Sequence, residues 1–319
     1  MRRGRVGRPG IRVARAVAVG VLVAVTGACA QTEGGGAGAG ASPGRPEVSA
    51  GAGTGIGAGA GAGAASAVPG GRAGEGVPGR AAPVAPGVDA RGVAAKAYAR
   101  WGLAGPLAPV PVKPDRTPVL KASGPPVVLD RVRTRDKVVF LTFDDGAEKD
   151  PAFVRMVREL KLPISMFLTD SVAGSDYGHF EQLRAAGATV QNHTTGHANL
   201  RTLAYEGQRA QICGQQDRLK ARFGTRPALF RPPYGNYNAD TVRAAGSCGV
   251  RALVLWRESM QINNMRYAEG DRLKPGDIVL AHFRGPDELK GSTITEMTAR
   301  MLRRIQEQGF TVAKLEDYL

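Results

Sequence analysis

From residue 137 onward, short apolar runs alternate with stretches of helical length, and this alternation constrains the fold more than any other feature of the chain. The runs predicted as strands are residues 137–143, 164–168, 188–191, 228–231, 252–256, 278–281 and 310–313. The segments predicted as helices are residues 151–160, 180–186, 203–223, 239–245 and 293–308. Strands that alternate with helices imply parallel βαβ units with right-handed crossovers. About seven strands within roughly 180 residues predict one barrel-like α/β domain.

The first 30 residues have the pattern of an export signal. They carry six arginines and no acidic residue, and an uncharged stretch from Ala16 to Ala28 follows. That stretch is short for a membrane span. Ala28-Cys29-Ala30 fits a cleavage site, whereas Thr26 to Cys29 fits a loose lipoprotein motif that would attach lipid to Cys29. Both endings stay open, and either one predicts an exported protein.

Residues 31–130 are predicted to form a disordered tether and linker. Up to about residue 91 they are mostly Gly, Ala and Pro, so there is too little apolar surface to offset the backbone entropy lost on folding. Residues 92–130 are dotted with proline, and Trp101 and Leu103 are expected to anchor this linker on the folded domain. A flexible chain of about 100 residues has an end-to-end distance of about 50–60 Å. The predicted domain covers residues 131–319.

The charge of the predicted domain argues against one class of function. The whole chain carries a net charge of +15, of which residues 131–319 account for +6. This domain has no Lys/Arg block and no alternation of basic and aromatic residues of the kind that nucleic-acid platforms use. We therefore expect no nucleic-acid partner. Attraction to an anionic wall polymer is compatible with the mild basic charge.

The two cysteines of the predicted domain, Cys213 and Cys248, agree with export. An exported domain with two cysteines favours one disulfide. Two separate buried thiols are the alternative.

Nearly every chemically versatile side chain of the domain follows a predicted strand. These residues are Asp144 and Asp145 after the first strand, His193 and His197 after the third, Arg231 to Tyr234 after the fourth, Trp256 at the end of the fifth and His282 after the sixth. The carboxyl ends of parallel strands meet at one rim, where the active sites of such folds lie. We therefore expect these side chains to converge.

Two imidazoles and a carboxylate are a suitable ligand set for a divalent metal ion. His193 and His197 supply the imidazoles from a segment in which residues 194–196 disfavour a helix and favour a loop. The adjacent Asp144 and Asp145 favour a division of labour in which one carboxylate binds the metal and the other acts as a base. Like charges this close push their pKa values apart.

Four motifs of this region resemble those of the polysaccharide deacetylases, carbohydrate esterase family 4. They are Thr142-Phe143-Asp144-Asp145-Gly146, His193-Thr194-Thr195-Gly196-His197, Arg231-Pro232-Pro233-Tyr234-Gly235 and Leu280-Ala281-His282. They occur in the order and spacing of that family, and the resemblance covers about residues 137–319. It implies a distorted (β/α) barrel and hydrolysis of N-acetyl groups from N-acetylhexosamine units of peptidoglycan or a chitin-like glycan.

The resemblance also implies roles for individual residues. Asp145, His193 and His197 would bind a divalent ion, zinc in the first place, with cobalt or nickel as alternatives. Asp144 would be the general base, and Arg231 would orient it and keep it ionised.

For the later steps, the resemblance implies that the backbone N–H of Tyr234 binds the oxyanion and that His282 protonates the leaving amine. The family usually has an Asp-x-x-Asp-Trp motif after the fifth strand, and this chain has no such Asp-Trp pair. Glu258 is the candidate replacement for the Asp that tunes the catalytic His. The residues expected to line the substrate pocket are Pro232, Pro233, Trp256 and Glu258.

Two other functions stay open at this level. The same site would serve an esterase that removes O-acetyl groups from a glycan. The altered motif after the fifth strand also allows a degenerate domain that binds wall glycan without turnover. A serine hydrolase finds no support, because no Gly-x-Ser-x-Gly motif follows a strand in the folded region. The expected partner is an extracellular or cell-wall glycan, and the protein is expected to act as a monomer.

Overall fold

The computed structural model describes residues 88–112, 120 and 123–319. The predicted export signal, Cys29 and the Gly/Ala-rich tether lie outside the described residues. The strands are β1 (Val127–Leu129), β2 (Val138–Asp145), β3 (Ser165–Leu168), β4 (Thr189–Asn192), β5 (Leu229–Phe230), β6 (Ala252–Val254), β7 (Glu258–Met260), β8 (Met265–Tyr267), β9 (Ile278–His282) and β10 (Thr311–Val312). The helices are α1 (Val88–Arg100), α2 (Pro151–Leu160), α3 (Asp170–Ala173), α4 (Tyr177–Ala185), α5 (Tyr205–Phe223), α6 (Ala239–Ser247) and α7 (Ile294–Glu307).

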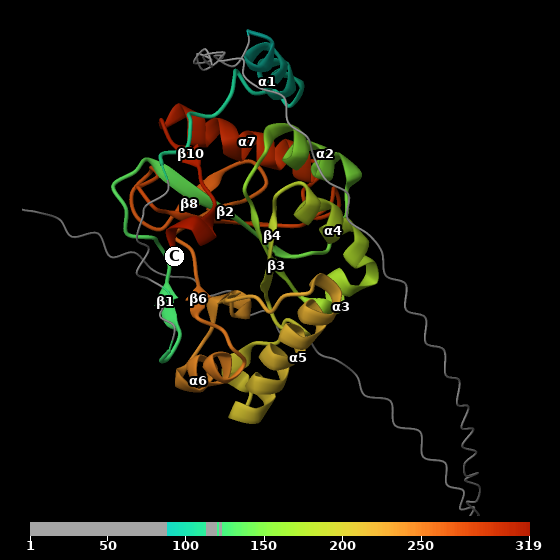
Figure 1. Ribbon diagram of the computed structural model, residues 1–319, viewed down its shortest axis with the longest axis vertical. Coiled ribbons are helices and arrows are strands. Elements are labelled where there is room, and N and C mark those ends of the chain that lie inside the picture. Colours follow the sequence, from blue (N-terminus) through green and yellow to red (C-terminus); the bar gives the residue numbers. More distant parts are fainter. Residues whose placement is uncertain (1–87, 113–119, 121–122) are drawn as a thin grey trace, which may run out of the picture. The chain divides into compact units, whose positions relative to one another are not determined.

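The strands form one sheet that curves around a central core, with the longer helices outside it (Figure 1). The strand order is β1-β6-β5-β4-β3-β2-β9-β7-β8, and β10 pairs with the start of β2. Every pairing between these strands is parallel except that of β7 with β8. All seven strands predicted from the sequence are present, and the distorted (β/α) barrel is confirmed. The short strands β1, β7 and β8 were not predicted.

The two sides of the sheet meet because the chain runs from β6 almost directly into β7. The N–H of Leu255 donates to the carbonyl of Leu129 on β1, at 2.8 Å. Two residues later the N–H of Arg257 donates to the carbonyl of Ile278 on β9, at 3.1 Å. One short segment therefore joins β1 on one side of the barrel to β9 on the other.

Strand β2 is buried on both faces, which explains its continuous apolar run. Its odd-numbered apolar residues belong to the core beneath the helices, whereas Val138 and Phe140 belong to a second core inside the barrel. Thr142 and Asp144 continue the inward-facing series, since side chains alternate along a strand. The pleat of β2 thus directs the Asp144 carboxylate into the barrel.

The five helices predicted from the sequence are present as α2, α4, α5, α6 and α7, with bounds that differ by at most three residues, whereas α1 and α3 were not predicted. Asp150 caps α2 by accepting a hydrogen bond from the N–H of Ala152 at 2.8 Å, and Pro151 occupies the first turn.

Cys213 on α5 and Cys248 at the end of α6 form a disulfide with a Cα–Cα distance of 5.0 Å, which is the pair suggested by the sequence.

The segment before residue 131 has more structure than its composition indicates. Val88–Arg100 forms helix α1, and the side chains of Tyr98 and Leu103 are buried in the main core. The indole N–H of Trp101 donates to Glu159 of α2 at 2.9 Å. Trp101 and Leu103 thus contact the domain as expected, but residues 88–103 are not an unstructured linker. Alanine-rich stretches favour helix. Among the described residues, no helix has the length and apolar character needed to cross a membrane.

Candidate metal centre and active site

Asp145, His193 and His197 come together at the carboxyl ends of β2 and β4, with one ligand atom of each within 4.8 Å of the others. The Nε2 atoms of His193 and His197 lie 3.6 Å and 3.3 Å from the Oδ1 atom of Asp145. That oxygen is buried and accepts no hydrogen bond from any described residue. Three potential ligand atoms therefore face one another across a space that a single cation suits.

The hydrogen bonding of His193 leaves the lone pair of its Nε2 atom free toward the cluster. Its Nδ1 atom lies 2.7 Å from the carbonyl oxygen of Arg231, and because a carbonyl only accepts, Nδ1 carries the proton. Burial lowers the pKa of His193 to about 3, so the ring is neutral at neutral pH. Burial also raises the pKa of Asp145. The Nε2 atom of His193 and the Oδ1 atom of Asp145 therefore face each other with no proton between them. Two such electron-pair donors are suitable ligands for a divalent ion.

Helix α5 holds the loop that carries both histidines. The Gln211 side-chain oxygen accepts hydrogen bonds from the Thr195 hydroxyl (3.0 Å) and the Gly196 N–H (2.9 Å). The side chain of Asn192 accepts from the N–H of Thr194 at 2.8 Å and donates to the carbonyl of Ile212 at 2.9 Å. These supports were not predicted from the sequence. The available signal was the run of glutamines on α5, of which Gln208, Gln215 and Gln216 are buried.

Backbone strain is concentrated at this rim. Six described non-glycine residues have positive φ, and four of them are Asp145 (73°), Thr194 (74°), His197 (53°) and Tyr234 (61°). Such conformations cost on the order of 1–3 kcal/mol each and persist only where the surrounding structure enforces them. Their clustering is typical of a functional site.

Arg231 holds the carboxylate of Asp144 inside the barrel through a hydrogen-bonded ion pair. Its Nη1 atom donates to the Asp144 carboxylate at 2.6 Å and contacts the Thr142 hydroxyl at 2.9 Å. Its remaining donors reach the carbonyls of Val254 (2.9 Å) and Leu255 (3.1 Å). Arg231 is fully buried and Asp144 is 3% exposed, so this is a desolvated, hydrogen-bonded ion pair. A buried carboxylate thus lies next to the candidate metal centre, with its other oxygen 3.5 Å from the Nε2 atom of His193.

The loop after β5 lies over the histidines. The ring of Tyr234 is exposed and its centroid lies 4.7 Å from that of His197. Trp256 lies beneath the loop, so close that a Cβ atom on Gly235 would stand 3.1 Å from the indole. Pro232 and Pro233 are buried. The structure therefore places Trp256 and Tyr234 at the rim, whereas the two prolines shape the loop from below.

His282 ends β9 directly opposite Asp144 of β2. No described residue forms a hydrogen bond with its ring. Burial lowers the pKa of His282 to about 4, while the charge of Asp144 acts in the opposite direction and Arg284 adds to the lowering. Beside this ring is a cavity of about 80 Å³ that Met260 also lines.

Glu258 does not lie at the rim, which corrects its predicted place in the substrate pocket and as the partner of His282. It begins β7, where its register neighbour on β9 is Val279, three residues before His282. Its side chain is 1% exposed and interacts with Asp277, which precedes β9 at the other end of the barrel. Strand β7, which Glu258 begins, starts near the amino end of β9 and not at the rim. It was not predicted, because the sequence around Glu258 has no apolar run of strand length.

The pairing of Glu258 with Asp277 predicts a pH-dependent stability. Burial, and then Asp277, raise the pKa of Glu258 from 4.5 to about 8. Between these pH values the folded protein holds a proton that the unfolded chain releases, so stability falls as pH rises through this window. The wild-type protein should lose about 1–4 kcal/mol of unfolding free energy between about pH 5 and pH 8 through this group, and we expect Glu258→Gln to abolish that loss. Chemical denaturation of the wild type and the variant at both pH values measures the free energy of unfolding. The same change of that free energy with pH in both proteins would contradict the prediction.

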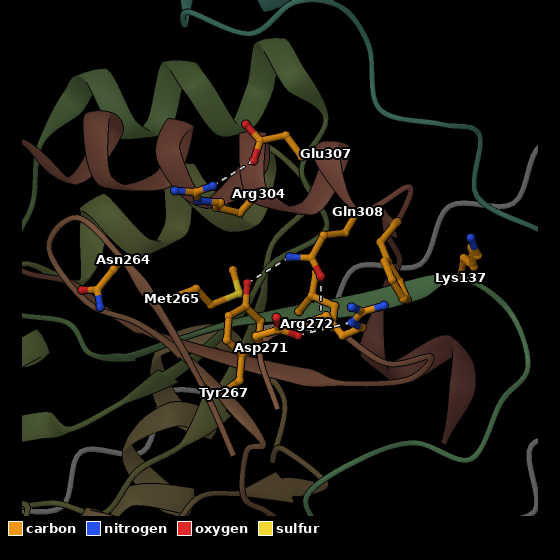
Figure 2. Close-up of a pocket in the computed structure, with 11 residues that line it drawn as sticks. Lys137, Asn264, Met265, Tyr267, Asp271, Arg272, Arg304, Glu307 and Gln308 are labelled. Atoms are coloured by element: carbon orange, nitrogen blue, oxygen red, sulfur yellow. Dashed lines mark hydrogen bonds and ion pairs between the residues drawn. The ribbon is translucent and has the colours of Figure 1, made fainter. Parts of the chain in front are cut away.

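A larger hollow of about 680 Å³ lies near the start of β2, away from the histidines (Figure 2). Its polar groups mostly pair with one another. Gln308 donates to the Tyr267 hydroxyl at 2.9 Å, and Arg304 pairs with Glu307 at 3.1 Å. None of the residues that form the candidate metal centre lines it, so this hollow is separate from that centre.

Comparisons with known proteins agree with this geometry. Residues 131–253 match the family model described as polysaccharide deacetylase. An uncharacterized protein of Streptomyces coelicolor is 54% identical over 196 residues, which cover 61% of this chain and 78% of that protein. The peptidoglycan-N-acetylmuramic acid deacetylase PdaC of Bacillus subtilis is 32% identical over 202 residues, which cover 59% of this chain but only 40% of PdaC.

A solved structure shares the fold. The crystal structure of the Bc1960 peptidoglycan N-acetylglucosamine deacetylase matches with a TM-score of 0.51 at 20% identity, covering 58% of this chain and 89% of that protein. The match covers most of the neighbour, so the barrel described above is a complete folded unit there as well.

Proposed function

The chain belongs to the polysaccharide deacetylase family, carbohydrate esterase family 4, and on this premise we propose that it is an exported, metal-dependent hydrolase of N-acetyl groups on N-acetylhexosamine units of a cell-wall or chitin-like glycan. The observation that carries the proposal is a metal-ligand cluster of Asp145, His193 and His197 beside a buried carboxylate that Arg231 holds in place. Metal ligands and a base in one place are what hydrolysis of an unactivated amide requires.

Asp145, His193 and His197 would bind the ion, for which we propose zinc, although cobalt or nickel also suits this donor set. When bound, the ion supplies a water of lowered pKa and polarises the acetyl carbonyl. The side chains of the protein would orient the substrate and transfer the protons.

Asp144 is assigned the role of general base. Its carboxylate accepts a hydrogen bond from Arg231 and lies 3.5 Å from the Nε2 atom of His193, within reach of a water at the centre. The backbone N–H of Tyr234 is assigned to the oxyanion. The positive φ of this residue turns its peptide away from helical bonding, and the N–H forms no backbone hydrogen bond with any described residue.

His282 is assigned the protonation of the leaving amine. Its pKa of about 4 means that the ring is neutral before reaction, so the proton that it delivers has to arrive during turnover. Asp144 lies opposite His282 in the sheet and is the nearest assigned proton acceptor, which makes it the source of that proton. This arrangement needs no carboxylate behind His282, and the absence of the Asp-Trp pair therefore does not stop the reaction.

The chain before the barrel would determine where the enzyme acts. We assign residues 1–30 to an export signal, with Cys29 as the candidate lipid anchor, and the Gly/Ala-rich segment to a tether of about 40–45 Å. The enzyme would then act as a monomer on a layer of glycan outside the membrane.

Removing the metal tests the centre. We expect a chelator to abolish deacetylation and added divalent ion to restore it. His193→Ala should lose bound metal and activity together, because two protein ligands rarely hold such an ion. His179→Ala is the matched control, since His179 is a buried histidine of α4 outside the cluster. Metal content by mass spectrometry decides, and a stoichiometric ion in His193→Ala would reject the ligand assignment.

The activity itself is tested by mass spectrometry of chitin oligomers and of cell-wall glycan fragments after incubation with the metal-loaded protein. Loss of acetyl groups from amide positions supports the proposal. Loss only from O-acetylated glycans would identify an esterase. Binding of glycan without loss of acetyl from any substrate would identify a non-catalytic glycan-binding domain.

A further inference from the structure

Arg284 lies two residues beyond His282, at the same rim as the metal cluster. Both side chains line the cavity of about 80 Å³, whose other walls are mostly apolar. A cavity of this size is too small for a sugar ring but accepts a substituent of a few heavy atoms. The other lining residues are the apolar Met260, Ile262, Leu289 and Met297 and the polar Gln261 and Glu288.

The guanidinium of Arg284 is available to a ligand. It forms no hydrogen bond with any described residue, and its acidic neighbour is Glu288, whose carboxylate lies 3.6 Å from Nε, beyond hydrogen-bond distance. The two side chains are 40% and 55% exposed. A loose, exposed pair of this kind is weak and readily exchanged.

A planar guanidinium with free donors recognises a carboxylate through two parallel hydrogen bonds. Under the proposed function the leaving nitrogen is at His282, and Arg284 is next to it. A group that reaches Arg284 must therefore be attached close to the acetamido nitrogen, and an acidic one would replace Glu288 as the partner.

We propose that Arg284 and the adjoining cavity form an anion subsite that selects N-acetylhexosamine units bearing a carboxylate on the ring position next to the acetamido group. This inference rests on the proposed function and specifies the substrate of the same site. It makes the enzyme prefer acidic amino sugars to neutral chitin-like units.

Three matched probes test the subsite with the metal-loaded protein. The first is a disaccharide of N-acetylglucosamine and N-acetylmuramic acid, which carries its carboxylate on the 3-O-lactyl group. The second is the same disaccharide with that carboxylate converted to the methylamide, and the third is a chitin oligomer. We expect kcat/KM to be about 10–100-fold higher for the acid than for the methylamide, as for a hydrogen bond to a charged group.

Two variants then assign the preference. Arg284→Gln should bring the acid-to-amide ratio of kcat/KM close to one, mainly by raising KM for the acid. Glu288→Gln should increase the ratio, because it removes the carboxylate that competes for Arg284. A wild-type ratio near one, or a ratio that Arg284→Gln leaves unchanged, would overturn the subsite. If the wild-type protein deacetylates only the chitin oligomer, the subsite is rejected and the proposed function stands. If it deacetylates none of the three probes, the subsite and the proposed function are both rejected.

Discussion

Replacing Asp144 by Asn should reduce deacetylation by about 10²–10⁴-fold while the metal stays bound. The amide keeps the shape of the carboxylate and still accepts the hydrogen bond from Arg231, but it cannot take a proton from water. Asp144 is not one of the three clustered ligands, so metal content should not change. Single-turnover kinetics and metal analysis of the same sample measure both effects.

Asp145→Asn is the matched control, because it changes the neighbouring carboxylate in the same way. Its Oδ1 atom faces both histidine Nε2 atoms, so this variant should lose metal and regain part of its activity at high metal concentration. If Asp144→Asn lost its metal while Asp145→Asn kept it, the roles of the two carboxylates would be reversed. Full activity in both variants would move the active site elsewhere.

Arg231→Met should destabilise the fold by about 3–5 kcal/mol and abolish activity. The variant leaves the carboxylate of Asp144 buried without its charge partner, and uncompensated buried charges have costs of this size. Urea denaturation of the metal-free protein isolates the effect on folding. Arg243→Met is the control, because Arg243 is an exposed residue of α6 paired with Asp240, and its loss should cost less than about 1 kcal/mol.

The double variant Arg231→Met with Asp144→Asn distinguishes charge from packing. If the buried charge causes the destabilisation, removing it should recover a large part of the lost stability. If the double variant is as unstable as Arg231→Met alone, the effect comes instead from the lost contacts of the guanidinium with the carbonyls and with the ring of Phe167, which lies 4.3 Å away.

The order of the barrel and the residues at its rim could be predicted from the sequence. Seven apolar runs of strand length alternate with helical segments, and four of them, the first, third, fourth and sixth, carry Asp, His or Arg at or just after the carboxyl end. Parallel strands must place these ends together, so Asp144, His193 and Arg231 could be expected to converge without any coordinates. Local signals also located the helices, as with the Asp150 cap and Pro151 at the start of α2.

Other features depend on contacts between segments that are distant in sequence. Glu258 was the candidate replacement for the Asp that tunes His282, yet the turn into β7 and its register on β9 place the carboxylate beside Asp277. Helix α1 was hidden in a composition typical of linkers, because its stability comes from docking Tyr98 and Leu103 into the core. Arg284 carried no motif, and only the fold places it on the same cavity as Met260 and Met297.

The sequence by itself determined which chemical groups the rim carries, since strand ends in a parallel barrel always meet. Only the tertiary structure decided how those groups act. The proton on Nδ1 of His193 follows from the carbonyl of Arg231, which is 38 residues away. The charge partner of the Asp144 carboxylate likewise is an arginine 87 residues away. Tautomer, ionisation and burial are properties of surroundings that distant segments build together, and no local pattern of residues contains them.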